Sequence, residues 1–96
     1  MTILPQAQSP EADAIEPSEL ALAALGWILE DQDRAERLLS LTGLTPQALR
    51  EGIMTAQVQG AVLEFLGNHE PDLLACAEAL AVSPGAIVAA EQELNA

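Results

Sequence analysis

The chain has 96 residues, half of them hydrophobic, which is enough for one domain with an apolar core and too apolar for a fully disordered chain. It contains 15 acidic residues, three arginines and no lysine, so the net charge is −12. That charge argues against direct binding to nucleic acid or to anionic lipid, both of which are negatively charged. It fits a solvated acidic surface, and it also fits a protein partner with a basic surface.

The N-terminal stretch, residues 1–16, is predicted to be a disordered acidic tail. It contains Pro5, Pro10 and three acids, without a periodic apolar face. We expect residues 17–96 to form a single helical domain. Because no basic stretch precedes an apolar run at the N-terminus, we expect no secretory signal and a cytoplasmic location.

The longest uncharged run extends from Leu20 to Leu29 and consists mostly of Leu and Ala, which are strong helix formers. Ser18 precedes it and is predicted to cap a helix over about 18–29. At ~1.5 Å per residue the run is roughly 15 Å long, about half of what a bilayer requires. A helix that is apolar on nearly every side is typical of a buried core helix, and Trp27 is its largest apolar side chain. Gly26 predicts a close crossing with another helix there.

Two short helices are expected next. Asp33 and Glu36 have the spacing of a capping box, which predicts a helix over about 34–41 with Asp33 as its N-cap. Gly43 follows where a left-handed C-terminal residue belongs. Thr45 and Pro46 are typical of an N-cap followed by the first helical position, so a third helix is predicted over about 46–51.

The C-terminal half predicts three further helices. The apolar residues between Val58 and Leu66 recur at helical spacing, which predicts a helix over about 55–66. Pro71 begins a second such pattern. Ser83 and Pro84 repeat the cap-and-proline signal, which predicts a last helix over about 84–94. No segment alternates apolar and polar residues for long enough to predict a strand.

The sequence therefore predicts an all-α fold: a compact bundle of five to six short helices around a buried apolar first helix. The largest apolar residues on the helical stripes are expected to form one core. These residues are Leu25, Trp27, Leu29, Leu38, Leu41, Val62, Phe65, Leu66, Leu73, Leu74, Leu80 and Ile87. The predicted helix caps are Ser18, Asp33, Gly43, Thr45 and Ser83.

The motif Leu-Thr-Gly-Leu-x-Pro-x-x-Leu-Arg covers residues 41–50. Together with the apolar run of residues 21–29 and the segment Val-Leu-Glu-Phe-Leu at 62–66, it resembles a family of small, acidic, all-helical bacterial domains of unknown function. The resemblance covers about residues 18–94. It implies a helical fold of this type, and it implies no activity, cofactor or site residue.

A second resemblance is local, because residues 75–94 are similar to a helix-turn-helix. A recognition helix needs Arg, Lys, Asn or Gln to contact phosphates and bases. The expected exposed positions here are Ala89, Ala90, Glu91, Gln92 and Glu93, of which only Gln92 is suited to reading a base edge. We therefore expect no direct binding to DNA.

Few residues suggest catalysis or metal binding. His69, Asp72 and Cys76 are residue types that bind zinc, and their spacing places them on one helix face. His69 precedes Pro71, Cys76 lies beside an apolar stripe, and no fourth ligand is evident. His69 and Cys76 are also about two helical turns apart, which is too far for a catalytic hydrogen bond. We therefore expect no catalytic, cofactor-binding or metal-binding residue.

The leading functional hypothesis is a non-enzymatic module that binds another protein through a helix face or through the acidic surface. The alternative hypothesis is a degenerate helix-turn-helix regulator that contacts DNA only together with a basic partner. The sequence identifies neither the partner nor the oligomeric state.

Overall fold

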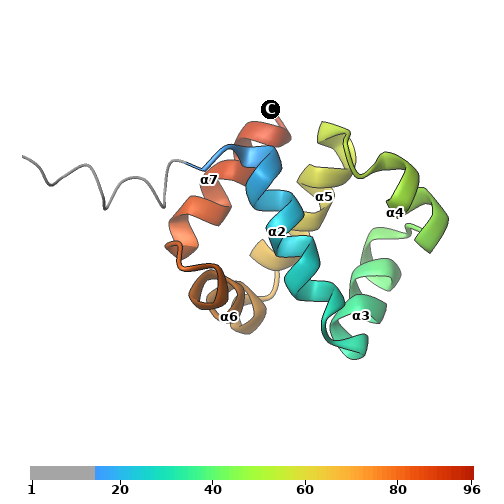
Figure 1. Cartoon of the computed structure of the whole chain (residues 1–96), viewed down its shortest axis with the longest axis horizontal. Coiled ribbons are helices and arrows are strands. Elements are labelled where there is room, and N and C mark those ends of the chain that lie inside the picture. The colour runs from blue at the N-terminus through green and yellow to red at the C-terminus, as the bar shows by residue number, and fades with distance from the viewer. Residues whose placement is uncertain (1–14) are drawn as a thin grey trace, which may run out of the picture.

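The described part of the chain, residues 15–96 of the computed structural model, folds into six helices and contains no strand (Figure 1). The helices are α2 (Pro17–Leu29), α3 (Gln32–Thr42), α4 (Pro46–Gly52), α5 (Ala56–Gly67), α6 (Glu70–Leu80) and α7 (Pro84–Leu94). The predicted all-α fold is confirmed. Of the predicted disordered tail, residues 1–14 lie outside the described residues.

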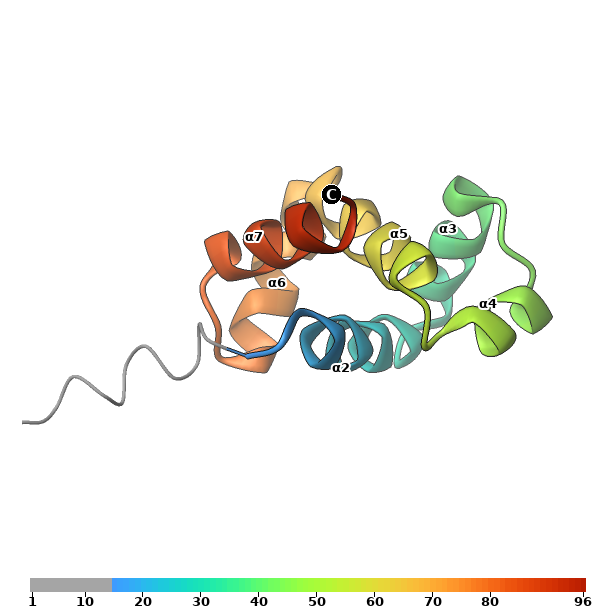
Figure 2. The ribbon, with the colours of Figure 1, turned by 90° about the horizontal axis from the view of Figure 1, so that it is seen from above.

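Helix α5 lies at the centre of the domain, because it contacts each of the other five helices. Figure 2 shows α5 and α7 together on one side and α2 on the opposite side. Seven of the twelve residues of α5 are buried. This burial explains why its apolar pattern is the most regular in the sequence.

Helix α2 is buried on one face only, so the prediction that nearly all its sides are buried is wrong. The buried face consists of Leu20, Ala21, Ala24, Leu25 and Ile28. Leu22 and Leu29 lie on the other side and are exposed. Within residues 15–96, the main contacts of α2 are with α3, α5, α6 and α7, and these contacts leave Leu22 and Leu29 uncovered.

The predicted core is correct in part. Leu25, Leu38, Val62, Phe65, Leu66 and Ile87 are buried, and Trp27, Leu73 and Leu80 are partly buried against them. Leu29, Leu41 and Leu74 are 51%, 73% and 48% exposed, so their assignment to the core is wrong. Helical spacing marks an apolar face, but burial also requires a neighbouring helix, and these three side chains stay largely in contact with solvent. Their places are taken by Leu20, Ile28 and Leu63, which are fully buried.

Three of the five predicted caps have the expected geometry. Gly43 ends α3 in the left-handed region with φ 76°. The hydroxyls of Thr45 and Ser83 accept hydrogen bonds from Ala48 N and Ala86 N, at 3.0 and 3.1 Å.

The other two predicted caps are wrong, because each helix begins earlier than its sequence signal suggested. Helix α2 starts at Pro17, which places Ser18 inside it. Helix α3 is capped by Asp31, whose Oδ1 accepts a hydrogen bond from Arg34 N at 3.0 Å, so Asp33 lies in the first turn. Thr55 is an additional cap, since it accepts a hydrogen bond from Val58 N.

The closest approach of a helix to a glycine is at Gly60 and not at Gly26. A Cβ atom on Gly26 would have no neighbour within 4 Å, so the predicted crossing there is wrong. A Cβ atom on Gly60 would lie 2.8 Å from Cγ of Asn95, whose amide donates a hydrogen bond to Gly60 O at 3.4 Å. Glycine at position 60 thus lets α5 and the end of α7 pack closely.

None of the described helices is by itself both long and apolar enough to cross a membrane. Taken together, α6 and α7 have enough length and apolar residues, but the pair is bent by 104°.

Candidate functional site

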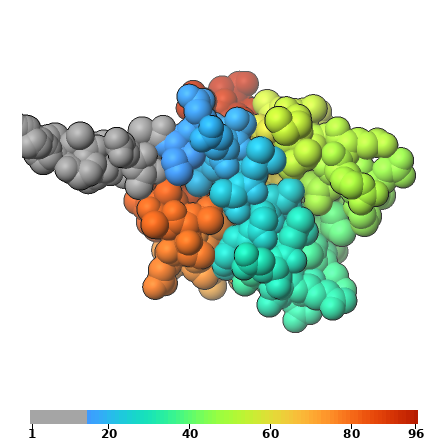
Figure 3. All heavy atoms as spheres, in the orientation of Figure 1, coloured from blue at the N-terminus to red at the C-terminus, as the bar shows by residue number. Residues whose placement is uncertain are grey.

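An apolar groove with a volume of about 390 Å³ lies between α2, α3 and α4. Leu25 and Leu49 are buried in it and Leu39 and Ile53 are half-buried, whereas Leu29, Pro46 and Arg50 are exposed. All three helices are visible on the face shown in Figure 3. Of the described residues that line this groove, Arg50 is the only charged one.

The groove exists because α4 is short and ends the domain on one side (Figure 1). Gly43 and Thr45 end α3 and begin α4 within three residues, which forces the chain to turn sharply. The main packing partner of α4 is α5. Helix α4 therefore leaves the end of α2 uncovered, which is why Leu29 stays half-exposed.

Sequence reasoning did not identify this groove. A usable signal was present: Pro46, Leu49 and Ile53 recur at spacings of three and four, so they form an apolar stripe along α4. Arg50 follows Leu49 directly and is the last arginine of the chain. The apolar stripe and the exposed Arg50 thus lie next to each other on α4.

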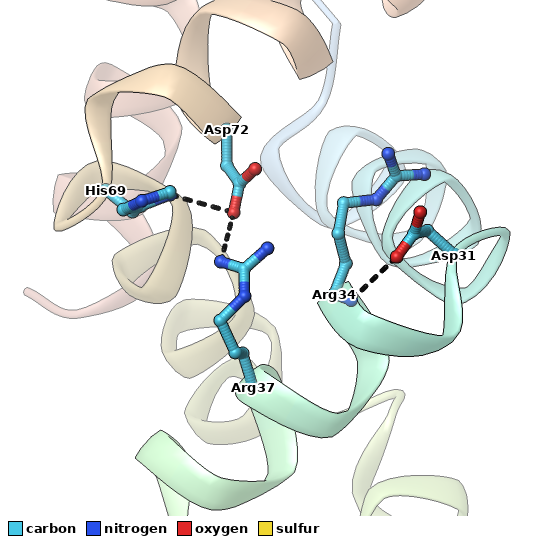
Figure 4. A network of polar contacts seen from close by, with 5 residues as sticks. All are labelled: Asp31, Arg34, Arg37, His69 and Asp72. Carbon is cyan, nitrogen blue, oxygen red and sulfur yellow. Dashed lines mark hydrogen bonds and ion pairs between the residues drawn. The ribbon is translucent and has the colours of Figure 1, made fainter.

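A second hollow, of about 610 Å³, lies between α3 and α5 and is bordered by Arg37, Leu41, Phe65, Asn68 and His69, among others. A polar network lies beside it (Figure 4). Nη1 of Arg37 donates a hydrogen bond to Oδ2 of Asp72 at 2.7 Å, and Nδ1 of His69 lies 3.0 Å from the same oxygen. Asp72 thus provides a polar partner for both Arg37 and His69.

The electrostatics of Asp72 follow from this network. Burial acts to raise the pKa of Asp72, but the hydrogen bonds from Arg37 and His69 outweigh that effect, so the pKa lies below its ordinary value. The hydrogen bond to Asp72 raises the pKa of Arg37 in turn. Asp72 is therefore ionised and paired with an arginine. A carboxylate in this state is unsuited to the role of a general base near neutral pH.

Arg34 also has a structural role. Its guanidinium carbon lies 3.7 Å from the centre of the Trp27 ring, a cation–π contact. Its Nη2 donates a hydrogen bond to Trp27 O at 2.6 Å. Arg34 therefore covers the part of Trp27 that the core does not bury, and it fixes α3 against the end of α2.

Arg50 differs from the other two arginines. Among the described residues it has no ion pair, hydrogen bond or ring contact, and its side chain is exposed. The groove thus combines an apolar interior with a cation at its rim that has no partner within the described residues.

The residues considered for zinc are not arranged as a ligand set. Asp72 pairs with Arg37, whose positive charge opposes a metal cation. Cys76 is fully buried, and burial raises the pKa of its thiol to about 11. The described residues contain no group of three His, Cys, Asp or Glu side chains suited to hold a metal ion.

The helix-turn-helix-like segment has the shape of that motif, but its second helix carries acidic residues and no basic residue for binding DNA. Helices α6 and α7 are bent by 104° at a short turn, which lies within the range of the motif. Ala81 adopts φ 59° at this turn. Ile87 and Ala90 face the core, and the exposed side of α7 presents Ala89, Gln92 and Glu93.

Residues 15–96 thus form an all-α domain of six helices with an apolar groove at one end. The chain belongs to the DUF3572 family of proteins of unknown function, whose model matches residues 14–96. The likeness to a family of small domains of unknown function, seen in the sequence, is confirmed. Comparison with curated proteins gave no match, and comparison with solved structures gave none either.

Proposed function

We propose that this domain is a non-enzymatic module for protein–protein interaction and that the groove between α2, α3 and α4 is its docking surface. The observation that carries the proposal is Leu29, a large apolar residue that is 51% exposed at the edge of an apolar groove. A concave, mostly apolar site of a few hundred Å³ is the usual candidate for a binding site on a domain.

A partner that covers the groove would bury apolar surface that is now exposed to water, which is favourable. Fully burying a leucine side chain contributes about 1.5–3 kcal/mol, so covering the exposed half of Leu29 contributes roughly 1 kcal/mol. Leu39 and Ile53 are half-buried in the same groove and would add to this gain. A partner side chain that enters the groove thus gains apolar contact without displacing any part of the core.

The remaining polar chemistry supports a role without catalysis. Cys76 is buried, with a raised pKa, and so is not an available nucleophile. His69 and Asp72 are held by each other and by Arg37. His69 and Asp72 are therefore engaged with Arg37 at the contact between α3 and α6, and Cys76 is enclosed in the core.

A second candidate function is a degenerate helix-turn-helix regulator that acts with a basic partner. The 104° bend between α6 and α7 favours it. The exposed side of α7 opposes it, because Glu93 would face the phosphates and only Gln92 is suited to reading a base. We rank this candidate second for that reason.

The test compares two leucines of nearly equal exposure, Leu29 in the groove and Leu74 on α6, at 51% and 48%. Tagged parent protein, Leu29→Gln and Leu74→Gln are used to capture proteins from an extract of the cells that make the chain. We expect mass spectrometry to find proteins that the parent and Leu74→Gln retain and that Leu29→Gln loses. Identical captured sets for all three would contradict docking in the groove.

A separate measurement tests the second candidate function. Binding of the isolated protein to duplex DNA at low salt, lost on Gln92→Ala, would favour that candidate.

A further inference from the structure

We infer that the groove binds an amphipathic helix of a partner protein whose apolar face enters the groove and whose carboxylate pairs with Arg50. This inference rests on the proposed function, namely that the groove is a docking surface. It adds the secondary structure of the partner segment and the charge that the segment carries at one position.

The size and surroundings of the groove favour a helix. The groove, of about 390 Å³, is lined by Leu29, Leu39 and Ile53, none of which is fully buried, so it has room for more than one aliphatic side chain of a partner. The walls are three helices, and helix-in-groove binding supplies such side chains at i, i+3, i+4 and i+7. The described residues contain no strand, so they offer no sheet edge to which an extended peptide could add.

The partner helix needs a carboxylate because one of the three arginines of the chain has no partner within the described residues. Arg34 is engaged by Trp27 and Arg37 by Asp72. Arg50 remains unpaired among the described residues and lies at the edge of an apolar groove. A guanidinium there can take a carboxylate in a bidentate geometry, which an apolar border strengthens by limiting access of water.

The rest of the acidic surface restricts where that carboxylate can be. Glu30 follows Leu29 directly and Glu51 follows Arg50, and the whole chain carries a net charge of −12. A helix with acids along its length would be repelled by this surface. A helix with one acid opposite Arg50, and neutral or basic residues elsewhere on its polar face, satisfies both conditions.

The experiment uses the full chain and a yeast-displayed library of helical peptides. The library randomises one face to apolar residues and randomises the flanking positions to acidic, neutral or basic residues. Selected peptides are then measured against the parent, Leu29→Gln, Leu74→Gln and Arg50→Glu. Arg50→Gln is a second variant in case charge reversal affects folding, which circular dichroism monitors.

We expect the selected peptides to carry an Asp or Glu at one fixed position and to bind Leu29→Gln poorly and Leu74→Gln normally. Arg50→Glu should weaken binding about tenfold, and changing the acid of the peptide to Lys should restore binding to Arg50→Glu.

The contrary outcomes separate the two proposals. If peptides depend on Leu29 but show no acidic preference and bind Arg50→Glu as they bind the parent, the inference about Arg50 is wrong and the groove remains a docking surface. If selection yields no peptide, or only peptides indifferent to Leu29, both are wrong.

Discussion

Nη1 of Arg37 in α3 donates a hydrogen bond to Oδ2 of Asp72 in α6 at 2.7 Å, across 35 positions of the sequence. His69, at the N-terminus of α6, approaches the same oxygen. This contact joins the α3 side of the domain to α6 (Figure 4). Because Arg34 contacts Trp27, Arg50 is the arginine that has no partner among the described residues.

The Arg37–Asp72 contact predicts a pH-dependent stability. The pKa of Asp72 is lower in the folded protein than its usual value of 3.8, so the folded state favours the ionised carboxylate. The stabilisation is therefore complete at neutral pH and is lost as the pH falls below about 4. Urea denaturation should find Asp72→Asn less stable than the parent at pH 7, by about 1 kcal/mol. The difference should shrink towards pH 2.

The control for this prediction is Glu64→Gln, which removes an exposed carboxylate that has no ion pair among the described residues. It should leave the free energy of unfolding close to that of the parent at pH 7. A difference between Asp72→Asn and the parent that stays constant from pH 7 to pH 2 would contradict the role assigned to the ionised carboxylate.

Two leucines on α3 provide a test of the core. Leu38 is fully buried and Leu41 is 73% exposed. Leu38→Ala should cost about 2–5 kcal/mol because it leaves a cavity, whereas Leu41→Ala should stay within about 0.5 kcal/mol of the parent. Thermal and urea denaturation measure both. Equal costs would mean that the boundary of the core is wrongly placed.

The start of α3 predicts unequal effects of two neighbouring aspartates. Asp31 accepts a hydrogen bond from Arg34 N, and Asp33 has no such role. Asp31→Ala should reduce stability by about 1 kcal/mol. Asp33→Ala removes only a favourable charge from the first turn, which contributes about 0.3–1 kcal/mol at low salt and less as salt is added. Denaturation at low and high salt separates the two, and the reverse order of costs would restore Asp33 as the cap.

Cys76 should be unreactive in the folded protein. It is fully buried, and its pKa is raised to about 11, so both access and thiolate formation are suppressed at pH 8. Mass spectrometry after treatment with iodoacetamide should find an unmodified thiol in native buffer and complete modification in urea. Rapid modification of the native protein would show that α6 opens readily or that the thiol is not buried.

Local sequence signals determined most of the secondary structure. Thr45, Ser83 and Gly43 satisfy the free N–H and C=O groups of their own helix ends, and such contacts depend only on residues a few positions away. Local signals did not decide between Asp31 and Asp33, which lie two positions apart at the start of α3. The choice of Asp31 depends on where the chain leaves α2, which is a property of the packed structure.

Tertiary structure alone decided which apolar residues are covered. In α2 nearly every position from Leu20 to Leu29 is apolar, so periodicity does not identify the buried face. Packing of α2 against α3, α5, α6 and α7 buries Leu20 and Ile28, and the short α4 leaves Leu29 open at the groove. The position of Arg50 at the edge of the groove likewise depends on how α4 packs in the folded domain. Burial depends on contacts between residues far apart in sequence, and for that reason the candidate site became visible only in the folded domain.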